Sequence, residues 1–370
     1  MVGAGPSGAI AARQMASRGA AVLLVDKSSF PRAKICGCCL NASALGTLRE
    51  IGLGDLPKRL GARPVWELKL AAGGRRASIP LPEGLALSRE RLDAALVDEA
   101  IRAGAVFLPR TEAALDGMNA GARRLLLRQG KHQEKAQARV VLAADGVGGS
   151  LLQSEPGIRR RVARDSRIGV GTIAEHATDD YGPGKIFMGC GRNGYAGLVR
   201  LEDGRLNIAA AFDPGFVRRA GGPGRAVEQT LREAALPRIE GLDLLCWRGT
   251  PALTTRRSPL AAERLFLLGD AACYIEPFTG EGISWALASG RAVAPLALEA
   301  TQRWEPSLAP RWARAHRRLI GRRQFVCRIT AKFLRRRALT RAAVGLLSWV
   351  PWASAPMVRH VNREMAWQRV

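Results

Sequence analysis

The sequence Gly3-Ala4-Gly5-Pro6-Ser7-Gly8 has the spacing GxGxxG and lies at the start of the chain. A helix-forming segment (7–17) and an apolar run (21–25) follow, and Asp26 comes 18 residues after the third glycine. In a strand–turn–helix of this kind the helix N-terminus offers free N–H groups to phosphates, and the acid accepts hydrogen bonds from ribose hydroxyls. The stretch therefore predicts a Rossmann-like dinucleotide-binding unit, in preference to a glycine-rich turn without a ligand.

Only Met1 and Val2 precede the first glycine, where such a unit ordinarily has a full β-strand. That strand lies in the middle of the sheet, so its loss would cost core packing. We therefore expect the natural chain to extend upstream of Met1.

A second motif follows the apolar segment LFLL (265–268), which leads into Gly269-Asp270 and then PFTGEG (277–282). Open α/β sheets bind ligands at the carboxyl ends of their strands, so Asp270 is expected to bind sugar-chain hydroxyls. The helix expected from Gly282 to Glu299 offers N–H groups to an anionic ring edge. A third apolar strand (139–144) ends in the same way at Asp145-Gly146.

The composition limits the class of protein. The 370 residues carry a net charge of +25, with seven cysteines and four histidines at no metal-ligand spacing. These counts predict reduced thiols, no metal site and a cytoplasmic protein. The first motif starts at Gly3, so no cleavable signal is expected. No nucleic-acid-binding motif appears, so no nucleic acid is expected as a partner. His176 and His316 are interpreted as ordinary surface or core residues.

The C-terminal region concentrates the positive charge. Residues 303–370 hold 16 Arg and Lys, two acids and five of the eight tryptophans. Its apolar patch comprises Leu346, Leu347, Trp349, Val350 and Trp352. One interpretation is an interfacial helix on anionic lipid. The other is a set of helices that cap the substrate domain with solvated arginines.

As a set, the three motifs resemble flavin monooxygenases of the para-hydroxybenzoate hydroxylase fold, a superfamily shared with geranylgeranyl reductases and flavin-dependent halogenases. The segment FPRAKICG (30–37) is similar to a reductase-type segment, and SRERLD (88–93) is similar to a family helix start whose arginine lies near the FAD phosphates. The resemblance implies non-covalent FAD, reduced by NAD(P)H without a second nucleotide domain. The FAD contacts that it implies are Gly3, Gly5, Pro6, Ser7, Gly8, Asp26, Lys27, Arg89, Asp145, Gly146, Gly269, Asp270, Pro277, Gly280, Gly282 and Ile283.

The expected fold class is α/β, a three-layer Rossmann-like FAD-binding domain with an inserted antiparallel β-sheet substrate domain and C-terminal helices. Hairpin signals at Gly73-Gly74, Asn193-Gly194 and Asp203-Gly204 predict the antiparallel part. We predict a discontinuous FAD-binding domain (1–63, 86–155 and 254–300), a substrate domain (64–85 and 156–253) and a basic helical region (301–370).

The substrate segment (195–200) departs from the reductase pattern, because Tyr195 is the only residue of that pattern that remains. Tyr195 is expected to line the substrate pocket. The halogenase motifs are absent as well. Cys36 matches the family cysteine beside the flavin, and a thiolate there is a candidate catalytic group. The alternative, which we favour, is that Cys36, Cys38 and Cys39 pack as small residues.

These observations favour an NAD(P)H-dependent monooxygenase that hydroxylates an apolar or aromatic small molecule of secondary metabolism. The alternative is a geranylgeranyl-reductase-like ene reductase acting on a lipid. A further alternative is a non-catalytic, membrane-associated protein on a degenerate flavin fold.

Overall fold

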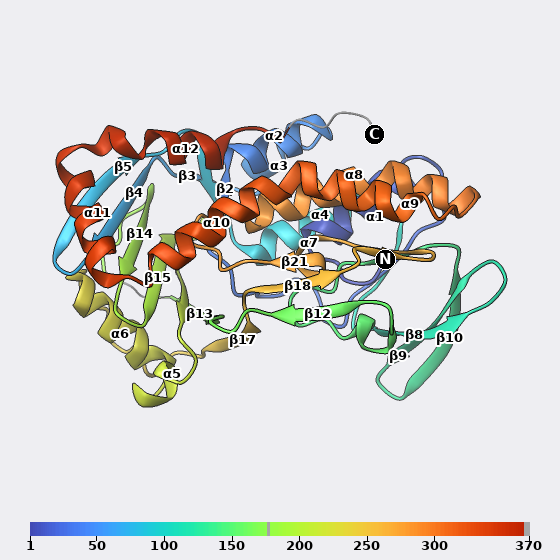
Figure 1. The fold of residues 1–370 in the computed structure, drawn as a ribbon, viewed down its shortest axis with the longest axis horizontal. Coiled ribbons are helices and arrows are strands. Elements are labelled where there is room, and N and C mark those ends of the chain that lie inside the picture. The colour runs from blue at the N-terminus through green and yellow to red at the C-terminus, as the bar shows by residue number, and fades with distance from the viewer. Residues whose placement is uncertain (176–177, 366–370) are drawn as a thin grey trace.

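The structure is a computed structural model that describes residues 1–175 and 178–365. It is elongated, with a parallel sheet and its covering helices in the middle (Figure 1). A seven-stranded sheet lies at one end and a small antiparallel sheet at the other. His176 lies outside the described residues.

The parallel sheet carries the motif strands. Val2 bridges Val25 on one side and Ala143 on the other, both in parallel, and so joins two pieces into one sheet. The order is β7, β1, Val2, β11, β20 and an antiparallel edge strand β19. The three predicted strands are confirmed but are shorter than expected: β1 (Leu23–Val25), β11 (Val141–Ala143) and β20 (Leu265–Leu267). The sequence did not predict β7 (Val106–Leu108) or β19 (Ala261–Ala262).

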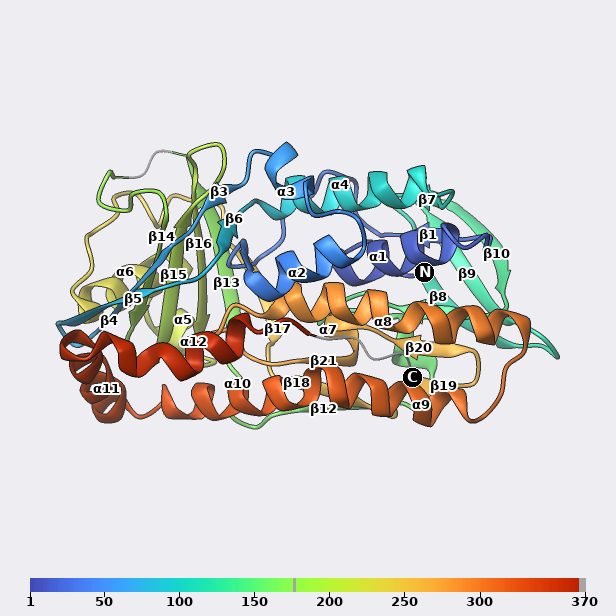
Figure 2. The same ribbon diagram turned by 90° about the horizontal axis from the view of Figure 1, so that it is seen from above.

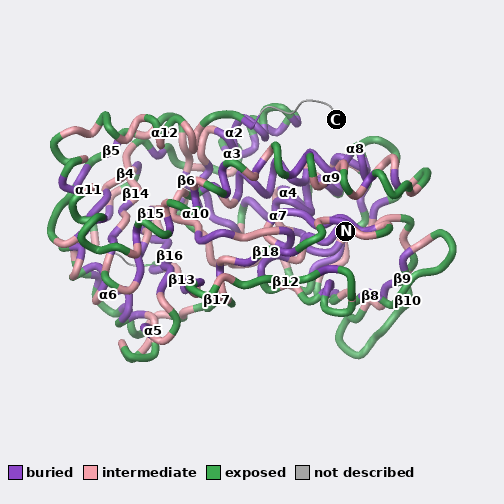
Figure 3. The backbone as a smooth tube through the Cα atoms, viewed as in Figure 1, coloured by how far each residue is buried: buried purple, intermediate pink, exposed green. Residues whose placement is uncertain are grey.

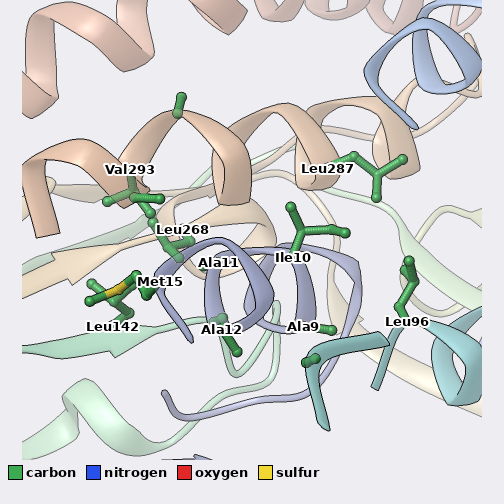
Figure 4. Packing of buried hydrophobic residues seen from close by; sticks show 14 of the residues in the cluster. Ala9, Ile10, Ala11, Ala12, Met15, Leu96, Leu142, Leu268, Leu287 and Val293 are labelled. Carbon is green, nitrogen blue, oxygen red and sulfur yellow. The ribbon is translucent and has the colours of Figure 1, made fainter. Parts of the chain in front are cut away.

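Helices cover this sheet and bury the core shown in Figure 4. The first helix, α1, lies against α8 so closely that a Cβ on Gly290 would be 2.3 Å from the Ser7 carbonyl oxygen. Ile10, Leu287 and Val293 fill the remaining contact between the two helices and are fully buried. The helices of this region are α1 (Pro6–Ala16), α2 (Ala42–Glu50), α3 (Leu56–Arg59), α4 (Arg89–Arg102), α7 (Gly269–Ala272) and α8 (Gly282–Gln302).

The seven-stranded sheet has the order β17-β13-β16-β15-β14-β4-β5. The predicted hairpins are confirmed, since β4 pairs β5, β14 pairs β15, and β15 pairs β16, each antiparallel. One pair departs from the expected antiparallel pattern: β14 pairs β4 in parallel. The long chain between these two strands permits that direction. The bounds are β4 (Glu67–Ala72), β5 (Arg75–Pro80), β13 (Ile168–Ala174), β14 (Lys185–Cys190), β15 (Gly194–Arg200), β16 (Leu206–Phe212) and β17 (Arg248–Ala252), with α5 (Phe216–Arg219) and α6 (Pro223–Ala234) beside them.

Three smaller sheets were not expected from the sequence. The antiparallel sheet at the far end of Figure 1 consists of β8 (Glu112–Met118), β9 (Arg123–Gln129) and β10 (His132–Ala138), with η1 (Leu151–Ser154) beside it. A second sheet consists of β12 (Arg159–Val162), β18 (Thr255–Ser258) and β21 (Cys273–Tyr274). The third consists of β2 (Cys39–Asn41), β3 (Arg63–Pro64) and β6 (Gly84–Ala86).

The chain ends in helices that run back across the molecule and turn around the outer edge of the seven-stranded sheet (Figure 2). They are α9 (Leu308–His316), the π-helical turn η2 (Arg317–Gly321), α10 (Arg322–Phe333), α11 (Arg337–Trp349), η3 (Pro351–Ser354) and α12 (Ala355–Asn362). Trp312 is fully buried and donates a hydrogen bond to the Leu267 carbonyl at 3.1 Å. His316 packs against Trp312 and is a core residue. Among the described residues, no helix combines the length and hydropathy needed to cross a bilayer.

Candidate functional site

One continuous cavity runs from the carboxyl ends of the parallel strands to the inner face of the seven-stranded sheet. It brings together residues from all three sequence motifs. The predicted residues on its wall are Gly3, Gly5, Pro6, Ser7, Asp26, Lys27, Cys36, Arg89, Asp145, Gly146, Tyr195, Asp270, Pro277, Gly280, Gly282 and Ile283.

The GxGxxG turn forms one end of the cavity. Gly5 is the N-cap of α1 and has no side chain to cap the helix, so the first N–H groups of α1 remain free for a ligand. Beside it, Asp26 accepts backbone hydrogen bonds from Ala4 at 2.8 Å and Ser28 at 2.9 Å. These bonds fix the carboxylate at the end of β1, where its remaining lone pairs are available to hydroxyl groups.

Besides the exposed Lys27, three basic side chains line the cavity near this end. Arg89 makes a bidentate ion pair with the fully buried Asp93, at 2.8 and 2.7 Å. Arg32 lies 3.4 Å from Asp93 and 3.6 Å from Asp26. Burial, together with the charges of Arg89 and Arg32, lowers the pKa of Lys34. Such a concentration of buried cations is suited to a polyanion such as a pyrophosphate.

The second motif lies beside the first, since a Cβ on Gly269 would lie 2.7 Å from Ser7 Oγ. Asp270 follows β20, and burial raises its pKa to about 6, against the opposing charges of Lys34 and Arg89. Gly282 is the first residue of the 21-residue helix α8, so the free N–H groups of that helix start at the cavity. The cavity wall therefore includes the starts of two helices, α1 and α8, and two acids, Asp26 and Asp270.

The third motif contributes an unsatisfied acid. Asp145 accepts a hydrogen bond from the Leu151 backbone at 3.0 Å through one oxygen. Its other oxygen, Oδ1, is buried with no hydrogen-bond partner among the described residues. Burial also raises the pKa of Asp145. A Cβ built on Gly146 would lie 3.2 Å from Lys34 Nζ, and both residues line the cavity.

Two predicted contacts, Gly8 and Gly269, are absent from the cavity wall. A Cβ on Gly8 would lie 1.9 Å from the Gly3 carbonyl oxygen, and one on Gly269 would lie 2.7 Å from Ser7 Oγ. Both glycines therefore allow backbone segments to pack closely. Their direct contact with FAD stays a prediction.

Cys36 lies on the wall between the two halves of the cavity. It accepts a hydrogen bond from the Cys38 backbone at 3.4 Å, and its own carbonyl accepts one from Asn207 at 2.9 Å. Hydrogen bonding from the Cys38 thiol lowers the pKa of Cys36 to about 5, with the charge of Arg89 assisting and burial opposing. These surroundings favour the thiolate form of Cys36, which the sequence alone did not show.

The other half of the cavity is largely apolar. It lies against the seven-stranded sheet and is lined by Leu68, Leu81, Ile186, Met188, Leu198 and Leu253. Tyr195 also lies on this wall, with its ring 5.1 Å from that of Phe278 in an edge-to-face contact. Its hydroxyl is buried without a partner among the described residues.

Sequence reasoning missed three polar residues near the boundary of the halves: Lys34, Asn207 and Tyr274. Lys34 and Tyr274 line the cavity. Burial and the nearby charges of Asp270 and Cys36 raise the pKa of Tyr274 well above its usual range. Lys34 stands inside the FPRAKICG segment and was the easiest to find. Tyr274 and Asn207 carry no motif signal, because only the fold brings them to Cys36.

The residues present fit FAD. The buried cations match its pyrophosphate, Asp26 and Asp270 match its hydroxyl-bearing sugars, and the start of α8 matches the electron-rich edge of the flavin ring. The unpartnered oxygen of Asp145 further indicates that a polar group belongs in the cavity. When bound there, FAD supplies two-electron transfer.

The sequence matches the family model of the FAD binding domain over residues 1–189, which is half of the chain. The chain belongs to this family. It is an FAD-dependent oxidoreductase of the superfamily that the three motifs indicated.

Known proteins resemble this flavoprotein along most of its length. It is 28% identical over 339 residues to a digeranylgeranylglycerophospholipid reductase of Methanosphaerula palustris, with 84% of this chain and 78% of that protein covered. It is also 28% identical over 339 residues to a menaquinone reductase of Mycobacterium tuberculosis, with 85% and 80% covered. The solved structure of the flavin-dependent brominase Bmp2 shares the fold, with a TM-score of 0.81, 14% identity and 98% and 92% of the two chains covered.

Proposed function

We propose that this flavoprotein reduces carbon–carbon double bonds in an apolar, lipid-like substrate, with NAD(P)H as electron donor. The observation that carries the proposal is the apolar half of the cavity, which is continuous with the flavin half. It provides a dry site for a hydrocarbon chain directly beside the FAD-binding residues. The names of the relatives, a prenyl-lipid reductase and a quinone reductase, support the same reaction class.

Saturating a double bond adds a hydride equivalent to one carbon and a proton to the other, so the cavity needs a proton donor. Cys36 is a poor donor, because its hydrogen bond with Cys38 and the charge of Arg89 lower its pKa and favour the deprotonated form. Tyr274 retains its proton, because burial raises its pKa. We assign the proton-donor role to Tyr274. For Cys36 we propose a different role: its charge and that of Arg89 position the flavin in its half of the cavity.

The decisive experiment is anaerobic. The FAD-loaded protein is reduced with NADPH or NADH and mixed with a prenyl quinone, while flavin absorbance is followed and the product is weighed by mass spectrometry. We expect flavin reoxidation without oxygen and a product that, after its quinol ring has been oxidised back to the quinone, is two hydrogens heavier for each saturated carbon–carbon double bond. A reduced flavin that is not reoxidised by any prenyl quinone or prenyl lipid would refute this proposal.

Substitutions separate the two side chains. Tyr274→Phe is expected to slow reoxidation by substrate at least about tenfold, as loss of a general acid does, while reduction by NAD(P)H is retained. Cys36→Ser is expected to alter flavin affinity and absorbance, and Cys246→Ser, at an exposed cysteine that does not line the cavity, serves as its matched control. Full turnover by Tyr274→Phe would remove that residue from the reaction.

Hydroxylation is the second candidate. The observation in its favour is that Gly197 and Val199 stand where the prenyl reductases have aromatic residues after Tyr195. Both reactions begin with the same reduced cofactor, so the anaerobic assay distinguishes them. A product that forms only with oxygen and contains one added oxygen atom would favour a monooxygenase. A protein that binds no flavin would favour the non-catalytic alternative.

A further inference from the structure

Exposed apolar side chains are concentrated on the C-terminal helices. Of the 13 large hydrophobic side chains that are exposed among the described residues, seven lie between residues 325 and 352. A patch of this kind on a soluble surface marks a contact with another apolar phase or molecule. The seven are Phe325, Ile329, Phe333, Leu339, Leu346, Trp349 and Trp352.

On α10 three of them form a stripe. Phe325, Ile329 and Phe333 are spaced by four residues and therefore share one face of the helix. Arg328 and Lys332 are exposed on the same side and flank the stripe. The opposite face, with Cys327 and Ala331, is buried against the rest of the protein and holds the helix in place.

The next helix extends this surface. On α11, Thr340 and Val344 are buried against the seven-stranded sheet, where the helix packs on β5. Leu339, Leu346 and Trp349 occupy the outward side, and Trp352 follows in η3. Trp349 and Trp352 are 87% and 78% exposed, so most of each ring has no contact with the rest of the chain. The outer turns of α11 are coloured as exposed in Figure 3.

The charge of this surface has one sign. No Asp or Glu occurs between Glu305 and Glu364, a stretch that holds 14 Arg and Lys residues. Arg311, Arg323 and Arg335 form ion pairs with acids of the main body. The other cations are exposed and form no ion pair within the described part of the chain: Arg314, Arg317, Arg318, Arg322, Arg328, Lys332, Arg336, Arg337, Arg341, Arg359 and Arg363.

We propose that α10, α11 and η3 form a docking surface for an anionic lipid bilayer. Apolar and tryptophan side chains among unpaired cations are the composition of helices that lie at a membrane interface, where the rings enter the headgroup region and the cations meet lipid phosphates. A second copy of the chain fits less well, because it would bring two acid-free surfaces of the same sign together.

The docking surface lies close to the cavity. Helix α12 begins just after Trp352 and ends at Asn362, and its last residues, Val361 and Asn362, line the cavity wall. Eight helical residues span about 12 Å. Two hydrogen bonds of 3.2 Å tie this end of α12 to Asn41 and Ala42 at the cavity. A substrate dissolved in the bilayer would therefore have a short path to the cavity.

The experiment uses FAD-loaded protein and co-sedimentation with vesicles, either of phosphatidylcholine alone or with phosphatidylglycerol added. We expect binding to the anionic vesicles that weakens with added salt, and a blue shift of tryptophan emission on binding. Trp349→Ser/Trp352→Ser is expected to weaken binding at least about tenfold, since it removes two membrane-inserted rings. The matched control is Leu244→Ser, at a residue that is 84% exposed on another part of the surface.

Each outcome bears on the proposal. Absence of binding to anionic vesicles, or equal binding by the double tryptophan variant, would overturn it. A shift from dimer to monomer in that variant would assign the patch to contact between copies instead. No step of this assay requires turnover, so a failure of docking and a failure of the proposed reductase activity are distinguished. The high exposure of both tryptophans makes loss of folding an improbable confounder, and a melting curve of the variant checks it.

Discussion

Replacing Gly8 by alanine tests whether this glycine of the GxGxxG turn serves backbone packing, while Gly5 serves FAD binding. The added methyl would lie 1.9 Å from the Gly3 carbonyl oxygen and 3.2 Å from Ala144 Cβ. Real side chains essentially never approach a backbone oxygen within 3 Å, so α1 must move away from the sheet by about 1 Å or more. Overpacking of this kind costs about 1–3 kcal/mol and sometimes more. The better helix propensity of alanine returns at most about 1 kcal/mol.

We therefore expect Gly8→Ala to lose about 2 kcal/mol of unfolding free energy and several degrees of melting temperature, as measured by urea titration and thermal melting of the FAD-free protein. Gly5→Ala should behave differently. Its methyl would point into the cavity, 3.6 Å from Arg32 Nη2, and would meet no backbone atom. We expect unchanged stability but FAD binding weakened by about 10–100-fold, or about 1.4–2.7 kcal/mol, read by fluorescence titration.

Gly121→Ala is the control, because nothing lies within 4 Å of its added methyl. It should change neither stability nor FAD affinity. The reasoning would be refuted if Gly8→Ala matched this control in stability, or if Gly5→Ala bound FAD as tightly as the unmodified protein.

Two further predictions concern buried ionisable side chains, His316 and the Arg323–Glu281 ion pair. Burial lowers the pKa of His316 to about 4, so the unfolded chain binds more protons than the folded one between that value and about 6.5. Its contribution to stability is complete above the unfolded pKa and is lost as pH falls through this window, by up to about 3 kcal/mol. Urea titrations at several pH values should show this slope reduced in His316→Phe and retained in a variant of the exposed His132. Arg323→Met should cost about 3–5 kcal/mol, because it leaves the buried carboxylate of Glu281 unpaired. Adding Glu281→Gln should restore part of that loss in the same denaturation assay, and a single variant as stable as the parent would contradict this account.

Local sequence signals were sufficient for the parallel sheet and its ligand turns. The spacing of Gly3, Gly5 and Gly8, and the acids after the apolar strands, follow from short-range geometry, and each predicted strand is present. The signals were weaker at strand ends. The predicted strands were longer than the three-residue pairings that form, because apolar residues continue past the last ladder hydrogen bond.

Long-range contacts could not be predicted in the same way. The parallel pairing of β14 with β4 joins segments more than a hundred residues apart, and no local pattern specifies its direction. The same applies to Tyr274 and to the low pKa of Cys36, which depends on Cys38 and Arg89 being held together by the fold. Gly8 and Gly269 show a further limit of sequence reasoning. A glycine in such a motif can allow a ligand to approach or backbone segments to pack, and the spacing alone does not distinguish the two.

The buried indole of Trp312 bears on how this lineage can change. The residue that accepts its hydrogen bond, Leu267, lies three positions before Asp270, and the chain after Trp312 carries the proposed docking surface. An exchange of the last seventy residues with a relative would thus remove a piece of the core along with the surface. Recombination at residue 300 should mostly yield unfolded proteins. A change of target membrane is easier through single substitutions on the outer faces of α10 and α11, which leave the interior untouched.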